Sequence, residues 1–257
     1  MYARLLPFLA PPGQEPGTAD AGPAGAPDPT DVFRRPFAPR AQAPAPGGPA
    51  PTAVLLGAPP VPVPAQLRED IKEAYAHSDA LLEEQRFAQA AEVLGEVITP
   101  AALALGSESR QVLALRRQRA AIRLLGGDYR AALPEFDALA DAYARIAGPT
   151  GEQARACRAQ AARCRAELGQ VTDALAALQG VLNVVRAVDS DVSEEAVELR
   201  HNIGMLLLAQ GRTAEAQQVL EPLHQDMCMV FGPEDEMTVE IAEALAVIRL
   251  DLDGSAS

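Results

Sequence analysis

The chain has 257 residues and a net charge of −13, with 48 % hydrophobic residues, only 4 % aromatic residues and no tryptophan. Much of the hydrophobic content is alanine and leucine, which disfavours a β-sandwich because strands are enriched in β-branched and aromatic residues. The acidic total disfavours general nucleic-acid binding, which needs a basic face.

The first ten residues, Met-Tyr-Ala-Arg-Leu-Leu-Pro-Phe-Leu-Ala, predict a short helix over 2–6 that stops at Pro7. Their apolar run is short and lacks the cleavage context of a signal peptide. Residues 2–9 resemble the last helix of the catalytic lobe in actinobacterial serine/threonine protein kinases, where a Pro/Ala-rich linker and helical repeats follow. The resemblance implies that 1–10 is the remnant of a kinase C-lobe. The alternative is a disordered start.

Residues 11–66 are predicted to form a disordered linker rich in Pro, Ala and Gly. Of the 22 prolines, 17 lie within residues 1–64, and proline prevents regular helix and sheet ladders. Such a composition buries too little apolar surface to offset chain entropy. Two patches interrupt the linker, the aromatic and basic stretch 31–37 and the apolar stretch 52–64. The first is either a docking peptide or plain spacer. The second either lies along a surface, where it covers the first repeat or pairs with a missing domain, or is plain spacer.

Residues 67–257 are predicted to form a repeat domain with a period of 42 residues. The columns that recur are an alanine (Ala90, Ala132, Ala174, Ala216), a small residue twelve positions earlier (Ser78, Ala120, Ala162, Gly204), a turn residue (Gln85, Gly127, Gly169, Gly211) and an end residue (Gly106, Gly148, Ser190, Gly232). Small residues let two helices cross closely, so each unit is predicted to be a helix pair. Stacked pairs then share one continuous core.

The order of small residue, Gly, Tyr-like residue, Ala and large apolar residue resembles the tetratricopeptide repeat. The segment 231–238 resembles the turn between the longer units of the kinesin-light-chain type. The family's early Trp position departs from the pattern and holds Ala74, Arg116, Arg158 and Arg200. The resemblance covers about three quarters of the chain. It implies an all-α fold, a right-handed superhelical solenoid of four helix-turn-helix repeats plus a C-terminal capping helix.

The apolar periodicity predicts helix pairs at 67–85 and 88–105, 108–126 and 130–147, 151–168 and 172–188, and 193–210 and 214–230. We expect Pro100 to kink or shorten its helix, and Thr172 and Ser193 to cap theirs. A last helix, 234–252, has no partner. Its polar positions Glu236, Glu240, Glu243 and Asp251 suit the end of a solenoid.

Motifs of catalysis are missing from the sequence. There is no G-x-G-x-x-G turn, no P-loop and no kinase H-R-D or D-F-G motif. The three histidines lie in different helices, and the three cysteines form no C-x-x-C pair. No run approaches the roughly 18 apolar residues of a membrane span. We therefore predict no catalytic residue, no cofactor, no metal and no membrane span, and a cytoplasmic location with reduced thiols.

Charge is uneven along the repeats, at −6 for residues 67–109, +6 for 110–165 and −13 for 166–257. The basic middle is either a docking patch for an acidic segment or a solvated face. In the tetratricopeptide family the first helices line a concave groove. The resemblance implies that the peptide-binding positions here are Lys72, Tyr75, Arg117, Gln118, Gln160, Arg163, His201 and Asn202. The amides among them suit the main chain of an extended peptide, and Arg117 and Arg163 suit a carboxylate or phosphate.

The function predicted from the sequence is a protein–protein interaction scaffold that binds an extended acidic or phosphorylated peptide. By resemblance it is the C-terminal regulatory or substrate-recruiting region of a bacterial serine/threonine protein kinase. The alternative is the repeat region of a non-kinase signalling or transcriptional regulator. A reading frame that encodes H-R-D and D-F-G motifs upstream of the Met1 codon would decide between the two.

Overall fold

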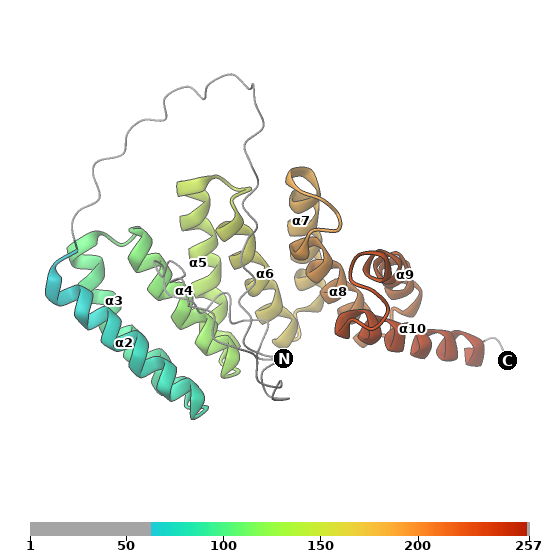
Figure 1. Cartoon of the computed structure of the whole chain (residues 1–257), viewed down its shortest axis with the longest axis horizontal. Coiled ribbons are helices and arrows are strands. Elements are labelled where there is room, and N and C mark those ends of the chain that lie inside the picture. The colour runs from blue at the N-terminus through green and yellow to red at the C-terminus, as the bar shows by residue number, and fades with distance from the viewer. Residues whose placement is uncertain (1–62, 256–257) are drawn as a thin grey trace, which may run out of the picture.

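The computed structural model describes residues 63–255, and within this range the chain forms helices and no strand. The helices are α2 (Ala65–Glu83), α3 (Phe87–Leu105), α4 (Arg110–Leu125), α5 (Tyr129–Ala147), α6 (Glu152–Glu167), α7 (Val171–Val188), α8 (Glu194–Ala209), α9 (Thr213–Val230) and α10 (Glu236–Ser255). Figure 1 shows them as successive pairs lying side by side, with α10 last. The predicted all-α stack of four pairs plus a C-terminal helix is confirmed. The predicted helix at 1–10 and almost all of the predicted linker lie outside the described residues.

The alanine and small-residue columns form the crossing point inside each pair. Ala90, Ala132, Ala174 and Ala216 are all 0 % exposed. In the first pair, the Ser78 hydroxyl donates a hydrogen bond to the Ala90 carbonyl oxygen over 3.4 Å, which joins the two columns directly. In the fourth pair, Gly204 lies so close to Leu220 that a Cβ added at Gly204 would stand 2.3 Å from Leu220 Cδ2. Small residues therefore set how closely the two helices of a pair approach.

The turn column ends each first helix in a left-handed residue. The φ angles are 59° at Gln85, 78° at Gly127, 79° at Gly169 and 69° at Gly211. The next backbone N–H returns to the helix end, as from Arg86 to the Leu81 carbonyl oxygen at 2.8 Å. This is the closing bond of a Schellman turn, in which glycine is favoured because it has no Cβ to strain. Gln85 adopts the same conformation at a steric cost.

Replacing Gln85 by glycine is expected to raise the free energy of unfolding by about 0.5–1 kcal/mol. The left-handed conformation costs an L-residue about 1–2 kcal/mol, and part of the gain is lost because glycine is more flexible in the unfolded chain. Urea unfolding followed by circular dichroism measures the change. The reverse substitution, Gly127→Ala, should lower stability by a similar amount, and equal stability of all three chains would contradict the argument.

The helix ends correct some details of the sequence prediction. Thr172 does not cap α7, because the helix already begins at Val171 after Gln170, which makes no side-chain cap bond. Ser193 does cap α8, with its hydroxyl accepting from the Ala196 N–H at 3.4 Å. Pro100 does not shorten its helix, since α3 continues to Leu105.

Each second helix packs both on the first helix of its own pair and on the first helix of the next pair. Two of the described helices, α3 and α7, are long and apolar enough to cross a membrane by length and composition. Their apolar character has another explanation within the stack. Both bury one face between two neighbours, as Leu94 of α3 and Val185 of α7 show with 0 % exposure.

The second pair replaces part of its apolar joint with an ion network. The buried Glu135 carboxylate of α5 pairs with Arg119, with Arg123 over 3.0 Å and with Arg116 over 3.6 Å, all from α4. Two further arginines of the basic middle are also paired, Arg155 with Glu195 over 2.6 Å and Arg165 with Asp137 over 2.8 Å. Many of the arginines in residues 110–165 therefore form ion pairs within the stack.

Candidate peptide-binding surface

The first helices of the second and third pairs share a small hollow, which we name the α4–α6 hollow. Its lining is Arg117, Ala121 and Leu124 of α4, Phe136 of α5, and Ala156, Cys157 and Gln160 of α6. The α4 residues follow i, i+4, i+7 spacing, which places them on one face of the helix. The cavity volume is about 10 Å³, which is about the room that one water molecule needs. The hollow is thus a notch in a surface and too small for a cofactor.

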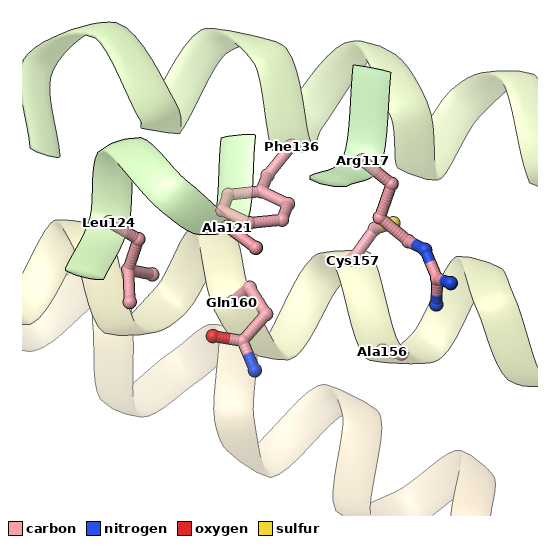
Figure 2. Close-up of a pocket in the computed structure, with 7 residues that line it drawn as sticks. All are labelled: Arg117, Ala121, Leu124, Phe136, Ala156, Cys157 and Gln160. Carbon is pink, nitrogen blue, oxygen red and sulfur yellow. The ribbon is translucent and has the colours of Figure 1, made fainter. Parts of the chain in front are cut away.

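The Arg117 guanidinium stands at the rim of this hollow (Figure 2). Its Nη1 donates a hydrogen bond to Gln153 Oε1 of α6 over 2.8 Å. Burial raises the pKa of Tyr75 of α2 to about 12 and the pKa of Tyr143 of α5 above its ordinary value. The nearby Arg117 charge lowers both pKa values by a smaller amount. Both phenols therefore stay protonated at neutral pH, near a cation that α4 and α6 hold in place.

The residues predicted from the sequence differ in exposure. Gln118 and His201 are buried, Tyr75, Arg117, Gln160 and Arg163 are partly buried, and Lys72 and Asn202 are exposed. The structure brings Arg117 and Gln160 together in the α4–α6 hollow. Arg163 follows Gln160 by three residues on α6, so the two share a face. Lys72 pairs with Glu69 over 3.6 Å, and His201 Nε2 lies 3.5 Å from Glu240 Oε1.

The three predicted amides Gln118, Gln160 and Asn202 stand 42 residues apart in one column of the repeat, but they do not form one accessible row. Gln118 is only 3 % exposed, whereas Asn202 lies at the surface. Gln160 is intermediate in exposure, and Figure 2 shows its side chain on α6 among the residues that line the hollow. Gln118 Nε2 and Gln160 Oε1 have no hydrogen-bond partner among the described residues. Of these two amides, Gln160 lines the hollow and is the better placed to meet a ligand.

Sequence reasoning missed Tyr143 and Gln153, which surround Arg117. Tyr143 falls 42 residues after Ala101 and 42 before Val185, both 0 % exposed. A phenol in a column of buried apolar residues was a usable signal, because a buried hydroxyl needs a polar neighbour. Gln153 gave no such signal, since polar residues are ordinary near the start of a first helix.

Nucleophilic chemistry finds little support among the thiols. Burial raises the pKa values of Cys157 and Cys164 to about 12, so both stay protonated and unreactive at neutral pH. Cys228 Sγ lies 3.6 Å from His224 Nε2 on the same helix, α9. Within the described residues, no group of three or more His, Cys, Asp or Glu side chains is placed to hold a metal ion.

Comparison with solved structures finds the same fold. A protein assigned as a kinesin light chain from Podosopora anserina, with nearly identical TPR-like repeats, matches at a TM-score of 0.59 and 20 % identity over 71 % of this chain and 85 % of that chain. A substituted form of it matches at 0.57 and 18 % identity over 75 % and 97 % of the two chains. BtubC (BKLC) from P. vanneervenii matches at 0.51 and 13 % identity over 74 % and 91 %.

The fold is therefore that of kinesin-light-chain-like tetratricopeptide repeats. No protein-family model and no curated protein matches the sequence. At identities of 13–20 %, the likeness establishes the fold, and function has to be argued from the surface itself.

Proposed function

We propose that the repeat domain is a protein-interaction scaffold that binds an extended acidic or phosphorylated peptide across α4 and α6. The observation that carries this proposal is the position of Arg117, partly exposed at the rim of the α4–α6 hollow and bonded to Gln153. A guanidinium offers five N–H donors, so it can hold a neighbouring amide and still bind a carboxylate or phosphate. The protonated phenols of Tyr75 and Tyr143 add neutral donors close by.

Gln160 and Arg163 extend this surface along α6. The Gln160 amide nitrogen carries donors that suit the main-chain carbonyl groups of an extended peptide. Its Oε1 is buried, so the side chain must turn before this oxygen can accept from a peptide. Arg163 supplies a second cation one helical turn further on. A peptide with two acidic groups spaced along an extended backbone would meet both arginines.

The double substitution Arg117→Glu with Arg163→Glu is expected to weaken peptide binding by at least about tenfold, since a charge reversal replaces attraction with repulsion worth more than about 1.4 kcal/mol. The probe is a fluorescent Gly/Ser peptide with two phosphoserines, measured by anisotropy with the 257-residue chain. A matched control is the pair Arg110→Glu and Arg130→Glu, which changes two exposed arginines away from the hollow.

The control should bind within about twofold of the unaltered chain, because it keeps Arg117 and Arg163 and because exposed charges act weakly at a distance in salt. Equal affinity of the unaltered chain and the Arg117/Arg163 variant would show that the peptide does not bind at the α4–α6 surface. Absence of binding by all three chains would show that the domain does not bind an acidic peptide of this kind.

The kinase association stays a prediction. It depends on residues 2–9 and on the order of helix, linker and repeats, which lie largely outside the described residues, and neither the fold nor the compared structures bear on it. We propose it as the setting in which the scaffold would recruit a substrate or regulator in the cytoplasm. The reading frame upstream of the Met1 codon remains the direct check.

A further inference from the structure

α10 occupies the place of the first helix of a fifth pair. It packs on α9 as α8 packs on α7 and α6 packs on α5. Ala246 lies 42 residues after Gly204 and so continues the small-residue column. The four earlier members of that column are buried at the crossing with a second helix, whereas Ala246 is exposed. Among the described residues, no second helix covers this side of α10.

α10 carries apolar residues on two faces. Ile241, Leu245 and Ile248 are buried in the stack. A second stripe, which we name the α10 seam, consists of Val239, Ala242, Ala246 and Leu250. Its members follow i, i+3, i+7, i+11 spacing, which aligns them along one side of a helix. All four are exposed, Val239 at 42 % and Leu250 at 73 %. The predicted polar positions Glu236, Glu240 and Glu243 are exposed, but they share the outer side of this helix with the apolar seam.

The seam has the shape that a second helix needs. In the complete pairs, a large apolar residue of the second helix follows the column alanine by four positions, as Leu220 follows Ala216. Leu220 lies directly against Gly204, the small residue of its pair. Ala242 and Ala246 also have small side chains, so they would let a second helix approach α10 closely, as Gly204 does in the fourth pair. An incoming helix with an alanine and a large apolar residue four positions later would repeat the packing of the earlier pairs.

The negative charge beside the seam favours an incoming helix that carries positive charge. Glu236, Glu240 and Glu243 are exposed and follow i, i+4, i+7 spacing, so they form one acidic flank. α9 adds a fourth carboxylate. Glu221 lies 42 residues after Gln179, and Gln179 lines the hollow between α7 and α9. A helix seated on α10 would run beside Glu221 as α9 runs beside Gln179.

We propose that the α10 seam binds a basic amphipathic helix of another protein, which completes a fifth helix pair. Lysines or arginines on that helix would face the acidic flank, and its apolar stripe would cover Leu250 and Val239. A second copy of α10 fits less well, because it would bring its own three glutamates to the same rim. This inference does not depend on the peptide site at Arg117, which lies on other helices.

A synthetic second helix tests the proposal. The probe is the 19-residue sequence of α5, Tyr129–Ala147, carrying Glu135→Lys, Asp137→Lys and Asp141→Lys. The matched peptide is the unaltered α5 sequence, which keeps its three carboxylates. We expect the basic peptide to bind the full chain at least about tenfold more tightly than its acidic parent, since complementary charge favours the right partner.

Variants of the full chain locate the site. Ala246→Arg fills the centre of the seam and is expected to weaken binding of the basic peptide at least about tenfold, because a bulky charge opposes both the fit and the charge of the incoming helix. Ala104→Arg makes the same change at an exposed alanine of α3 and should leave affinity within about twofold. Both sites are exposed, so circular dichroism should show unaltered helix content.

Three outcomes would overturn the proposal. The first is equal binding of the basic and acidic peptides, and the second is equal binding by the Ala246→Arg variant and the unaltered chain. The third is a self-associated chain, seen by sedimentation velocity, that Ala246→Arg converts to monomer. That result would assign the seam to a second copy.

Discussion

Replacing Glu135 by alanine is expected to lower the free energy of unfolding by about 3 kcal/mol. The Glu135 side chain is 6 % exposed and pairs with Arg116, Arg119 and Arg123. Removing one partner of a buried ion pair costs about 3–5 kcal/mol because it leaves uncompensated buried charge. We expect the lower end of that range, since the three arginines keep 22–30 % exposure and retain some water. Urea unfolding measures the loss.

An exposed pair in the same region supplies the control. Asp137 pairs with Arg165 over 2.8 Å, but the Asp137 side chain is 46 % exposed. Surface pairs are worth about 0–1 kcal/mol, so Asp137→Ala should cost far less than Glu135→Ala. Losses of similar size would show that burial does not govern the Glu135 network.

The fourth pair has apolar residues at three of the four positions of this network and keeps an arginine, Arg200, at the position of Arg116. Ile203, Leu207 and Val219 stand 84 residues, or two repeats, after Arg119, Arg123 and Glu135. Ile203 and Leu207 are buried. The triple substitution Arg119→Ile, Arg123→Leu and Glu135→Val should therefore recover most of the stability lost in Glu135→Ala, because apolar replacement of buried paired charges is often neutral or stabilising. Arg116, which the triple variant keeps, is 26 % exposed and still meets water. A triple variant less stable than Glu135→Ala would mean that the second pair needs its charges.

The repeat period made most of the fold predictable from the sequence. Residues that recur every 42 positions also recur in the same environment, so Ala132 and Ala174 could be assigned to helix crossings without any structure. Helix ends came out within about two residues for most elements, because glycines with left-handed backbone mark the turns. Thr172 was misjudged as a cap because a residue at a helix start can equally lie inside the first turn.

The candidate site followed less well from the sequence. Arg117 was found because the family resemblance assigns its position to the groove, but its neighbours Tyr143 and Gln153 come from other helices. Which side chains meet across helices depends on how the pairs are rotated against one another, and a column of residues does not carry that information. The buried state of Gln118 has the same origin, since Gln118 and Asn202 share a column and differ in exposure.

α8 and α9 cross so closely at Gly204 that a larger residue there should destabilise the fold. Gly204→Val is expected to lower the free energy of unfolding by about 3 kcal/mol, the upper part of the range for overpacking a core. The first added carbon alone would stand 2.3 Å from Leu220 Cδ2 and 2.6 Å from Leu220 Cγ, and Leu220 is 0 % exposed and has little room to move. Thermal and urea unfolding of the full chain measure the effect.

Gly180 of α7 separates this contact from a general effect of valine in a helix. A Cβ at Gly180 would meet nothing within 4 Å, so Gly180→Val should change stability by at most about 0.5 kcal/mol and in the favourable direction. Shortening Leu220 provides the second check. If Leu220 is the obstacle, the double variant Gly204→Val with Leu220→Ala will cost at least about 1 kcal/mol less than the sum of its single changes. Simple additivity would instead place the strain in the backbone of the crossing rather than in the contact between these two side chains.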